Sequence, residues 1–413
     1  MLSRRSEVQP RAKILQFPNL PRLHLEERAA ELRREGYSVL RLDTMDAAVF
    51  DLATPDPILR DMVATLPSAQ GYSDHQGMFA ARRSVALHYE TVPDFPRVDY
   101  SDVWLGNGAS ELILMSLQAL ISDGDEILLP RPSEAIWTSA TLLAGGRPVY
   151  YDCREDNNWD IDLDQLTHLV SDRTRAIVVS HPNNPTGRIY PDATLRAVAQ
   201  LCAKRNLVIL SDETLGRVIY PPATFRPVGV FARETLCLTF DSLSFGYRAP
   251  GYRAGWLVAS GASKPARQYL RALSVLSELR RSSNTLGQNA IQVALGGRQT
   301  ISELTAPGGR LWEQREAAVE SIRRIEGARC HKPEGGFSIF VGIDDDRFSS
   351  GYDPRRLAGD LLETQQVLVE PAECFSMDAA NHFRVTFLAR ERTFDSAARR
   401  IADFLRDLPE EQG

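Results

Sequence analysis

One short segment of the sequence has the residues of an anion site. Residues 106–111 read GNGASE, and an apolar stretch that is predicted to be a helix follows at residues 112–121. Glycines directly before a helix allow backbone N–H groups to point at a bound anion, and the helix dipole favours negative charge there. The same residues also make an ordinary helix cap. Both interpretations stay open on this segment alone.

Two further segments have residues suited to binding a small molecule. Residues 241–256 read DSLSFGYRAPGYRAGW and follow an apolar run, residues 236–240, that is predicted to be a buried strand. Residues 181–187 read HPNNPTG, in which two X-Pro pairs make a rigid turn. An arginine such as Arg253 offers a planar fork of donors that matches a phosphate group.

Together these segments resemble the coenzyme site of fold-type I, class I and II aminotransferases. The segment GYSDHQG at residues 71–77 places the resemblance closest to the alanine (glutamate-pyruvate) aminotransferase branch. The resemblance runs over nearly the whole chain. It implies a pyridoxal phosphate site with a phosphate cup, a partner for the ring nitrogen and a contact to the 3-oxygen, made by Gly108, Ala109, Ser110, Asn184, Asp212, Ser242, Ser244 and Arg253.

The resemblance also implies two contacts outside that group. Arg384 matches the arginine that holds the α-carboxylate of the substrate. Tyr72 matches a tyrosine that reaches the coenzyme phosphate of the neighbouring subunit, so a homodimer with its active site at the interface is expected. A packed tyrosine in a surface turn is the simpler alternative for Tyr72.

Four positions depart from the pattern of the family. Phe245 stands where the family has its Schiff-base lysine, and Glu134 stands where an aromatic ring stacks on the coenzyme. Leu215 replaces a tyrosine, and Met45 replaces a glycine whose backbone approaches the substrate. Lys264 is a second candidate amine, but it lies past the next strand and is not expected to reach the pocket.

These departures led us to expect an aminotransferase-like enzyme repurposed for chemistry that needs no Schiff base. The reaction would be an acid–base cyclisation, elimination or isomerisation of a small anionic, amino-acid-like substrate in specialised metabolism. Glu134 is a candidate acid or base if burial raises its pKa, and His75 is a second candidate. No covalently bound pyridoxal phosphate is expected. The alternatives are an enzyme with non-covalent pyridoxal or pyridoxamine phosphate, a non-catalytic aminotransferase-like partner protein, and an ordinary aminotransferase.

The arrangement of apolar segments predicts an α/β fold. Short apolar runs at residues 127–129, 148–151, 176–180, 208–211, 236–240 and 256–259 alternate with helical segments. Such runs are typical of a mostly parallel sheet covered on both faces, and ligands bind beyond the carboxyl ends of its strands. The fold of the family adds a seven-stranded type of sheet and a small α+β domain.

The domain boundaries follow from the same pattern. We expect an N-terminal extension at residues 1–22, a helix and strand joining the small domain at 23–50, the large domain at 51–300, the small domain at 301–408 and a tail at 409–413. The helix is predicted at residues 23–35 and its strand at 38–42. The segments before residue 13 and after residue 408 look disordered by composition.

Composition excludes several other classes of protein. The net charge of −6 gives no general attraction to nucleic acid or anionic membranes. No apolar run is long enough to span a membrane, and no signal-peptide core follows the N-terminus, so a cytoplasmic protein is expected. The five cysteines have no C-x-x-C spacing, so neither a disulfide framework nor a metal site is expected.

Overall fold

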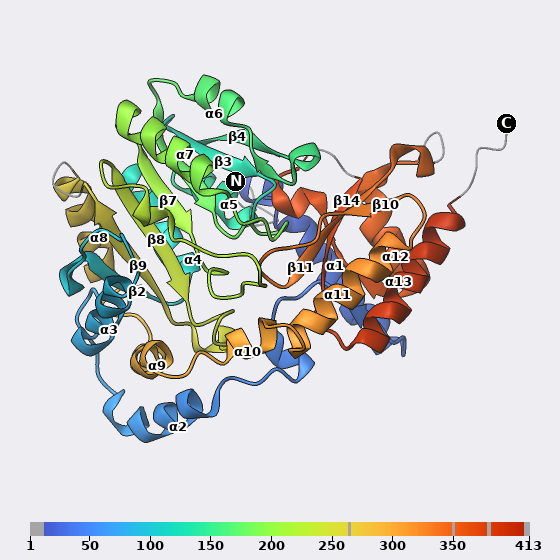
Figure 1. Cartoon of the computed structure of the whole chain (residues 1–413), viewed down its shortest axis with the longest axis horizontal. Coiled ribbons are helices and arrows are strands. Elements are labelled where there is room, and N and C mark those ends of the chain that lie inside the picture. The colour runs from blue at the N-terminus through green and yellow to red at the C-terminus, as the bar shows by residue number, and fades with distance from the viewer. Residues whose placement is uncertain (1–11, 263–265, 349–351, 378–380, 409–413) are drawn as a thin grey trace, which may run out of the picture.

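Eight strands form a single sheet in the larger domain (Figure 1). The computed structural model describes residues 12–262, 266–348, 352–377 and 381–408. The predicted disorder at the two ends and Lys264 therefore lie largely outside the described residues. In spatial order the strands are β2 (Val103–Gly106), β9 (Gly255–Gly261), β8 (Leu236–Ser242), β7 (Val208–Asp212), β6 (Thr174–Ser180), β3 (Glu126–Arg131), β4 (Arg147–Arg154) and β5 (Asp160–Ile161).

This sheet confirms the predicted fold class. Neighbours among β8, β7, β6, β3 and β4 run parallel. Strand β9 is antiparallel to both β8 and β2. The predicted seven strands are extended by β5, an antiparallel edge strand of two residues that pairs with the end of β4. All six apolar runs of the sequence lie within these strands.

Helices cover both faces of the sheet, which explains why its central strands are apolar on both sides. On one face Leu195 and Val198 pack with Ile177 and Val179 of β6. On the other face Trp137 packs among residues of β3, β6 and β8. The helices of the first face are α6 (Leu163–Leu169) and α7 (Asp192–Arg205), and those of the second are α4 (Ala109–Leu120), α5 (Ala135–Leu143) and α8 (Arg267–Leu279).

A separate apolar cluster covers the β2 edge of the sheet. Val85, Tyr89 and Ile291 pack there with Trp256 and Val258 of β9. Helices of this region are α2 (Asp56–Thr65), α3 (Phe79–Glu90) and α9 (Thr285–Gly296). They lie at the lower left of Figure 1.

The smaller domain is built on a four-stranded antiparallel sheet. Its strands, in spatial order, are β10 (Ala328–Cys330), β11 (Ser338–Ile343), β14 (His382–Thr386) and β13 (Glu370–Pro371). Its helices are α11 (Arg310–Arg323), α12 (Leu357–Gln365) and α13 (Glu391–Arg406), and the short α10 (Ile301–Thr305) precedes them. Helix α13 buries Phe394, Ile401 and Phe404 in the core of this domain.

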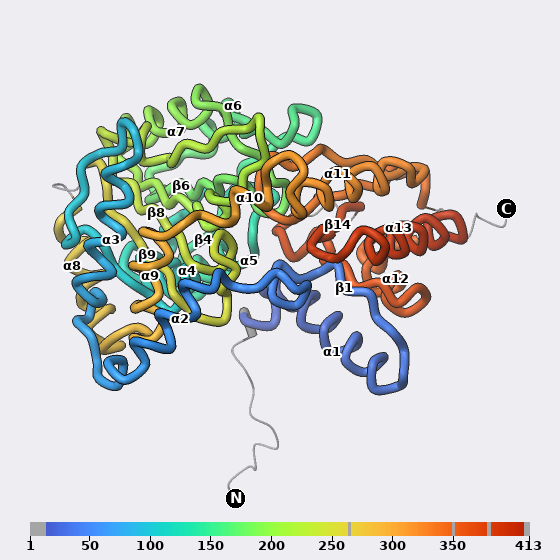
Figure 2. Tube along the Cα trace, turned by 60° about the horizontal axis from the view of Figure 1, so that its bottom comes forward, coloured from blue at the N-terminus to red at the C-terminus, as the bar shows by residue number. Residues whose placement is uncertain are grey.

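The start of the chain belongs with the smaller domain in space. Helix α1 (Leu20–Arg34) begins three residues before the predicted helix and packs on α12, with Ala29 and Leu32 against Leu362. Strand β1 (Leu40–Arg41) pairs in parallel with β12 (Val367–Leu368). Figure 2 shows α1 and β1 running below the C-terminal helices. Arg22 lies in the first turn of α1, and its side chain contacts residues of both domains.

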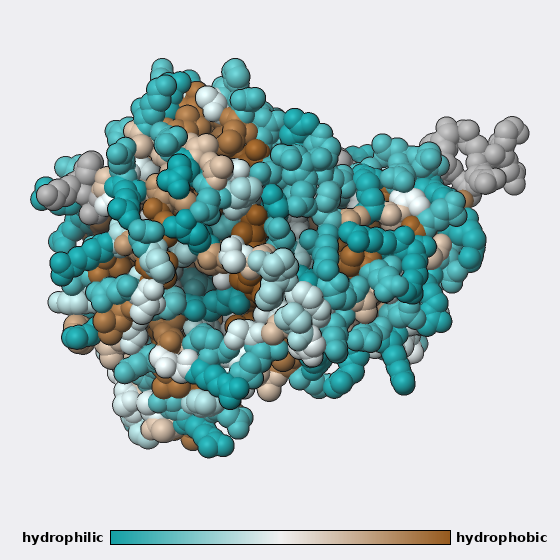
Figure 3. Space-filling view, in the orientation of Figure 1, coloured by the Kyte–Doolittle hydropathy of each residue, from teal (hydrophilic) through white to brown (hydrophobic). Residues whose placement is uncertain are grey.

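Two properties of the structure relate to the prediction that the chain does not span a membrane. Among the described residues, no helix has the length and apolar character needed to cross a membrane. Figure 3 shows a mostly hydrophilic face on which hydrophobic residues emerge chiefly over the larger domain.

Candidate active site

A cavity of about 370 Å³ lies beyond the carboxyl ends of the parallel strands, where ligands bind in such sheets. The sequence predicted many of its lining residues. Those that line it are Ala109, Ser110, Glu134, Asn184, Asp212, Leu215, Ser242, Ser244, Phe245 and Arg253. They come from segments far apart in the sequence, and the ends of β6, β7 and β8 bring them together. The residues that sequence reasoning missed include Arg22 and Thr214.

One end of the cavity is built for an anion. Gly108 precedes α4 with a φ of +82°, and a Cβ at this position would meet the Nη2 atom of Arg253 at 2.5 Å. Arg253 donates from that nitrogen to the Asn107 carbonyl at 3.1 Å. The positive φ favours glycine at position 108, and a larger residue there would also displace the end of the Arg253 side chain. The arginine, the start of α4 and the Ser110 hydroxyl share this end.

The serines of the 241–256 segment lie at the same end. Ser242 and Ser244 both line the cavity, and the backbone N–H of Ser244 donates to the Ser242 hydroxyl at 3.2 Å. The turn that follows β8 therefore carries its hydroxyls into the cavity. Sequence reasoning found these residues because they are local to one strand end.

Asp212 brings a carboxylate to the cavity at the end of β7. It accepts hydrogen bonds from the Trp137 indole at 3.2 Å and from the Thr214 hydroxyl at 2.7 Å. Burial raises the pKa of Asp212, although these hydrogen bonds oppose the shift. A carboxylate with little solvent is suited to pair with a protonated ring nitrogen.

Two more buried carboxyls lie directly behind Asp212. Glu213 accepts from the Ser211 hydroxyl at 2.8 Å and from the Val228 N–H at 2.9 Å. Burial raises the pKa of Glu213 to about 8, in spite of these bonds. Burial also raises the pKa of Asp241 to about 6, and the nearby Arg217 guanidinium opposes this shift.

These carboxyls predict a pH dependence of stability. An unfolded glutamate titrates near about 4.3, so between this pH and about 8 folded Glu213 holds more protons than the unfolded chain. Stability contributed by the neutral group is therefore lost as the pH rises through that window, and Asp241 acts in the same direction. We expect Glu213→Gln to flatten the fall in the free energy of unfolding between about pH 5 and pH 8. Urea unfolding across that range measures it, and a variant curve parallel to that of the parent protein would contradict it.

Glu134 faces the cavity but is already paired. The Nη2 atom of Arg22 donates to both of its carboxylate oxygens at 3.3 Å. Arg22 also pairs through Nε with Glu370 of the smaller domain. The side chain of Glu134 keeps 26% of its surface exposed. Its role as an acid or base stays a prediction, and no local pattern in the sequence pointed to Arg22 as its partner.

Arg384 lies behind the cavity and does not line it. Its guanidinium donates from Nη1 to the Asn184 side-chain oxygen at 2.9 Å and from Nη2 to the Asp43 carbonyl at 3.0 Å. It also forms a buried ion pair with Glu370. Burial lowers the pKa of Arg384 to about 10, which still leaves the guanidinium charged at neutral pH. Met45 supplies a sulfur acceptor at 3.1 Å.

Phe245 forms part of the cavity wall and also contacts the smaller domain. Its ring meets that of Phe337 edge-on at a centroid distance of 6.1 Å. It packs against the core of the smaller domain, as does Leu215. Both side chains make this wall apolar. Among the described residues that line the cavity there is no lysine.

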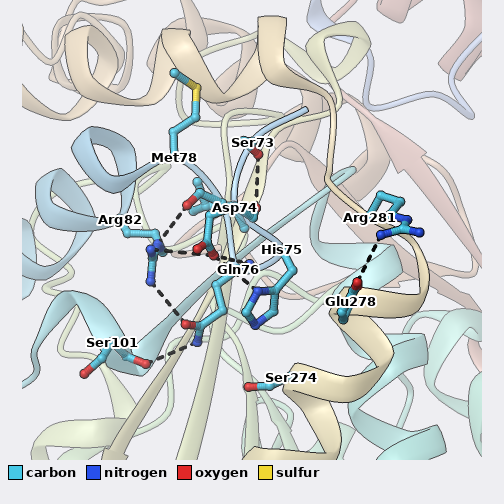
Figure 4. Close-up of polar contacts among 12 residues, drawn as sticks. Ser73, Asp74, His75, Gln76, Met78, Arg82, Ser101, Ser274, Glu278 and Arg281 are labelled. Atoms are coloured by element: carbon cyan, nitrogen blue, oxygen red, sulfur yellow. Dashed lines mark hydrogen bonds and ion pairs between the residues drawn. The ribbon is translucent and has the colours of Figure 1, made fainter. Parts of the chain in front are cut away.

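Tyr72 and His75 lie outside this cavity. Figure 4 shows His75 on the loop before α3, beside Asp74, with its Nδ1 atom 3.5 Å from the carboxylate. His75 instead lines a second cavity with residues of α8 and the loop that follows. The Tyr72 side chain is 84% exposed. Within one chain, therefore, neither residue joins the other predicted site residues.

The comparisons with known proteins decide the family. The family described as aminotransferase class I and II matches residues 48–401, which is most of the chain. The chain belongs to the class I and II aminotransferases. An alanine aminotransferase of Mycobacterium tuberculosis is 42% identical over 381 residues, covering 92% of this chain and 89% of that protein.

Other aminotransferases are similar over the same length. The glutamate-pyruvate aminotransferase AlaA of Escherichia coli is 39% identical and covers 91% of this chain and 93% of its own. The crystal structure of an aminotransferase from Escherichia coli superposes with a TM-score of 0.94, at 37% identity, and covers 97% of this chain and 99% of that one. This chain therefore shares the fold of that aminotransferase across both domains.

The comparisons correct two predictions made from the sequence. Chemistry other than amino-group transfer is contradicted, because relatives that match about nine-tenths of the chain are named aminotransferases. A site without covalently bound pyridoxal phosphate is contradicted by the same relatives, since the resemblance implies that coenzyme for their family. Both predictions gave the departures at Phe245, Glu134, Leu215 and Met45 more weight than the residues that match the family.

Proposed function

We propose that this aminotransferase moves an amino group between a small amino acid and a 2-oxo acid, using pyridoxal phosphate in the 370 Å³ cavity. One observation carries the proposal. The cavity has the Gly108–Arg253 anion cradle at one end and the buried carboxylate of Asp212 within the same wall. These are the two features that a phosphorylated pyridine requires from its protein.

The residues of the cavity have distinct roles in this proposal. Arg253, Ser110, Ser242 and Ser244 hold the phosphate group together with the N–H groups at the start of α4. The bound coenzyme acts as an electron sink during amino transfer. Asp212 keeps the proton on the ring nitrogen, because a carboxylate favours the protonated form of a neighbouring base. Trp137 and Thr214 fix the orientation of that carboxylate through their hydrogen bonds.

We also propose that Phe245 occupies the position at which the family carries its lysine. It follows Ser242 and Ser244 in the turn after β8, and its ring lies on the cavity wall. An amine at that place both binds the coenzyme and moves protons, which typically contributes about 10²- to 10⁴-fold to the rate. The rate of the parent protein is then limited by the absence of that amine.

The experiment supplies the purified protein with pyridoxal phosphate, ¹⁵N-labelled L-alanine and 2-oxoglutarate, because the relatives are named for alanine and for glutamate and pyruvate. Labelled glutamate is the expected product. Borohydride reduction and peptide mapping then identify the lysine that binds the coenzyme. The sequence has four lysines, of which Lys204 and Lys332 do not line the cavity. Absence of labelled glutamate from both the parent protein and a Phe245→Lys variant would overturn the proposed function.

We further propose a homodimer that covers the exposed apolar surface around Tyr72. Exposed apolar side chains lie on the loop before α3 and on α8, whose Val275 and Leu279 line a cavity with His75 of that loop. Tyr72, Val275 and Leu279 are 58–84% exposed. A second copy of the chain fits this surface because the resemblance places Tyr72 at the partner's coenzyme phosphate. Sedimentation should give twice the chain mass of 46.0 kDa, and Leu279→Glu should lower it. A parent protein that sediments as a monomer at high concentration would rule the dimer out.

A further inference from the structure

The guanidinium of Arg384 is already occupied by groups of the protein itself. Its Nη1 atom donates to Asn184 and Met45, and its Nη2 atom donates to the Asp43 carbonyl and to Glu370. Only Nε is buried without a hydrogen-bond partner. The residue has 3% of its surface exposed. A substrate carboxylate therefore finds no pair of free Nη donors on this arginine.

Glu370 is the carboxylate that pairs with Arg384. Its side chain keeps only 4% exposure and lies between two guanidinium groups, those of Arg384 and Arg22. Neither Glu370 nor Arg384 lines the cavity, whereas Asn184 and Arg22, which contact them, do. The pair is thus directly behind the cavity wall and within one hydrogen bond of it.

Displacing Glu370 from Arg384 is costly. A buried ion pair resists loss of one partner, because the remaining charge stays in a medium of low dielectric. Glu370 keeps the contact with Arg22 after such a displacement, so the exchange remains feasible, but the arriving carboxylate gains only the difference between two similar interactions. Binding of a carboxylate to Arg384 is weaker than to a free guanidinium for this reason.

We propose that Glu370 is a specificity-determining residue that competes with the substrate carboxylate for Arg384. It weakens the binding of amino acids and 2-oxo acids without touching the reacting atoms. The inference rests on the proposed function, in which Arg384 is the carboxylate-binding arginine. It predicts that the residue at position 370 does not change the affinity for ligands that lack a carboxylate.

Calorimetric titration with propionate tests the competition without any turnover. Propionate has the carbon chain and carboxylate of alanine but no amine. We expect Glu370→Gln to bind propionate at least about tenfold more tightly than the parent protein, which is the effect of one charge-assisted hydrogen-bonded pair. Ethylamine, which has no carboxylate, should bind both proteins equally. Glu363→Gln, which removes a carboxylate paired with Arg28 on the surface of the same domain, is the matched control.

Two further results separate this inference from its alternatives. The gain should disappear in the double variant Glu370→Gln/Arg384→Gln, and thermal unfolding checks that each variant is folded. In the Phe245→Lys background, Glu370→Gln should lower KM for L-alanine by a similar factor with little change in kcat. Equal propionate affinity in parent and Glu370→Gln, or a gain that survives loss of Arg384, would overturn the inference. Tighter propionate binding without any amino transfer would instead refute the proposed function alone.

Discussion

Replacing Phe245 with lysine is expected to raise the rate of amino-group transfer by at least about 100-fold, because it places an amine in the wall of a cavity that already has its anion and ring-nitrogen contacts. The side chain at this position lies on the cavity surface. A lysine is flexible enough to reach into the cavity along the same wall. Glutamate formation from L-alanine and 2-oxoglutarate measures the rate, and borohydride should then label the peptide that contains residue 245.

The matched control is Phe245→Met, which has an unbranched chain of similar length and no amine. Both variants lose the edge-on contact with Phe337, worth about 0.5–1.5 kcal/mol, so their free energies of unfolding should fall together. A difference in rate between them then reports the amine alone. If both variants are as slow as the parent protein, or if the parent is as fast as Phe245→Lys, position 245 does not limit the reaction.

Replacing Asp212 with asparagine in the Phe245→Lys background is expected to lower the rate by about 10²- to 10³-fold, the usual effect of removing one preorganised electrostatic group. The amide keeps the shape of the side chain and one acceptor oxygen, which can serve Thr214 or Trp137 but not both, because these two donate to different oxygens of Asp212. It removes the charge that holds a proton on the ring nitrogen. The loss should fall on kcat, measured in the same glutamate assay.

Asp241→Asn is the matched control for this prediction. Asp241 is also a buried carboxylate on a neighbouring strand, but it pairs with Arg217 and does not line the cavity. Its loss should lower stability, because Arg217 is left without its partner, and should leave kcat within a few-fold. Equal losses of kcat in the two variants would mean that Asp212 acts only through the fold.

Much of the fold was predictable because short apolar runs in the sequence mark its strands. The runs that become β6, β7 and β8 are mainly apolar because helices cover both faces of the sheet. Asp212 and Ser242 end β7 and β8, and Asn184 lies in the turn after β6. Adjacent parallel strands bring such ends together without any knowledge of side-chain contacts. The two-residue strand β5 was not predictable, because so short a strand leaves no periodic pattern.

The ion pairs of the site were not predictable from the sequence. Arg22 and Glu134 are separated by 112 positions and Arg384 and Asn184 by 200. No spacing rule joins residues from two domains, and Arg22 fell in the expected N-terminal extension, outside the helix predicted at residues 23–35. The wrong reaction had another cause, because the departures at four positions, Phe245 among them, were given more weight than the resemblance of nearly the whole chain.

Arg22, in the first turn of α1, connects the two domains through its side chain. Its guanidinium joins Glu134 of the larger domain to Glu370 of the smaller one. A shortened protein that starts after this residue would therefore lack the cation between the two carboxylates, of which Glu134 would lose its Arg22 partner and Glu370 would keep only Arg384. The side chain of residue 19 also accepts a hydrogen bond from Ser139. An N-terminal truncation made to produce the protein should therefore keep residue 19, and an affinity tag is better placed at the C-terminus.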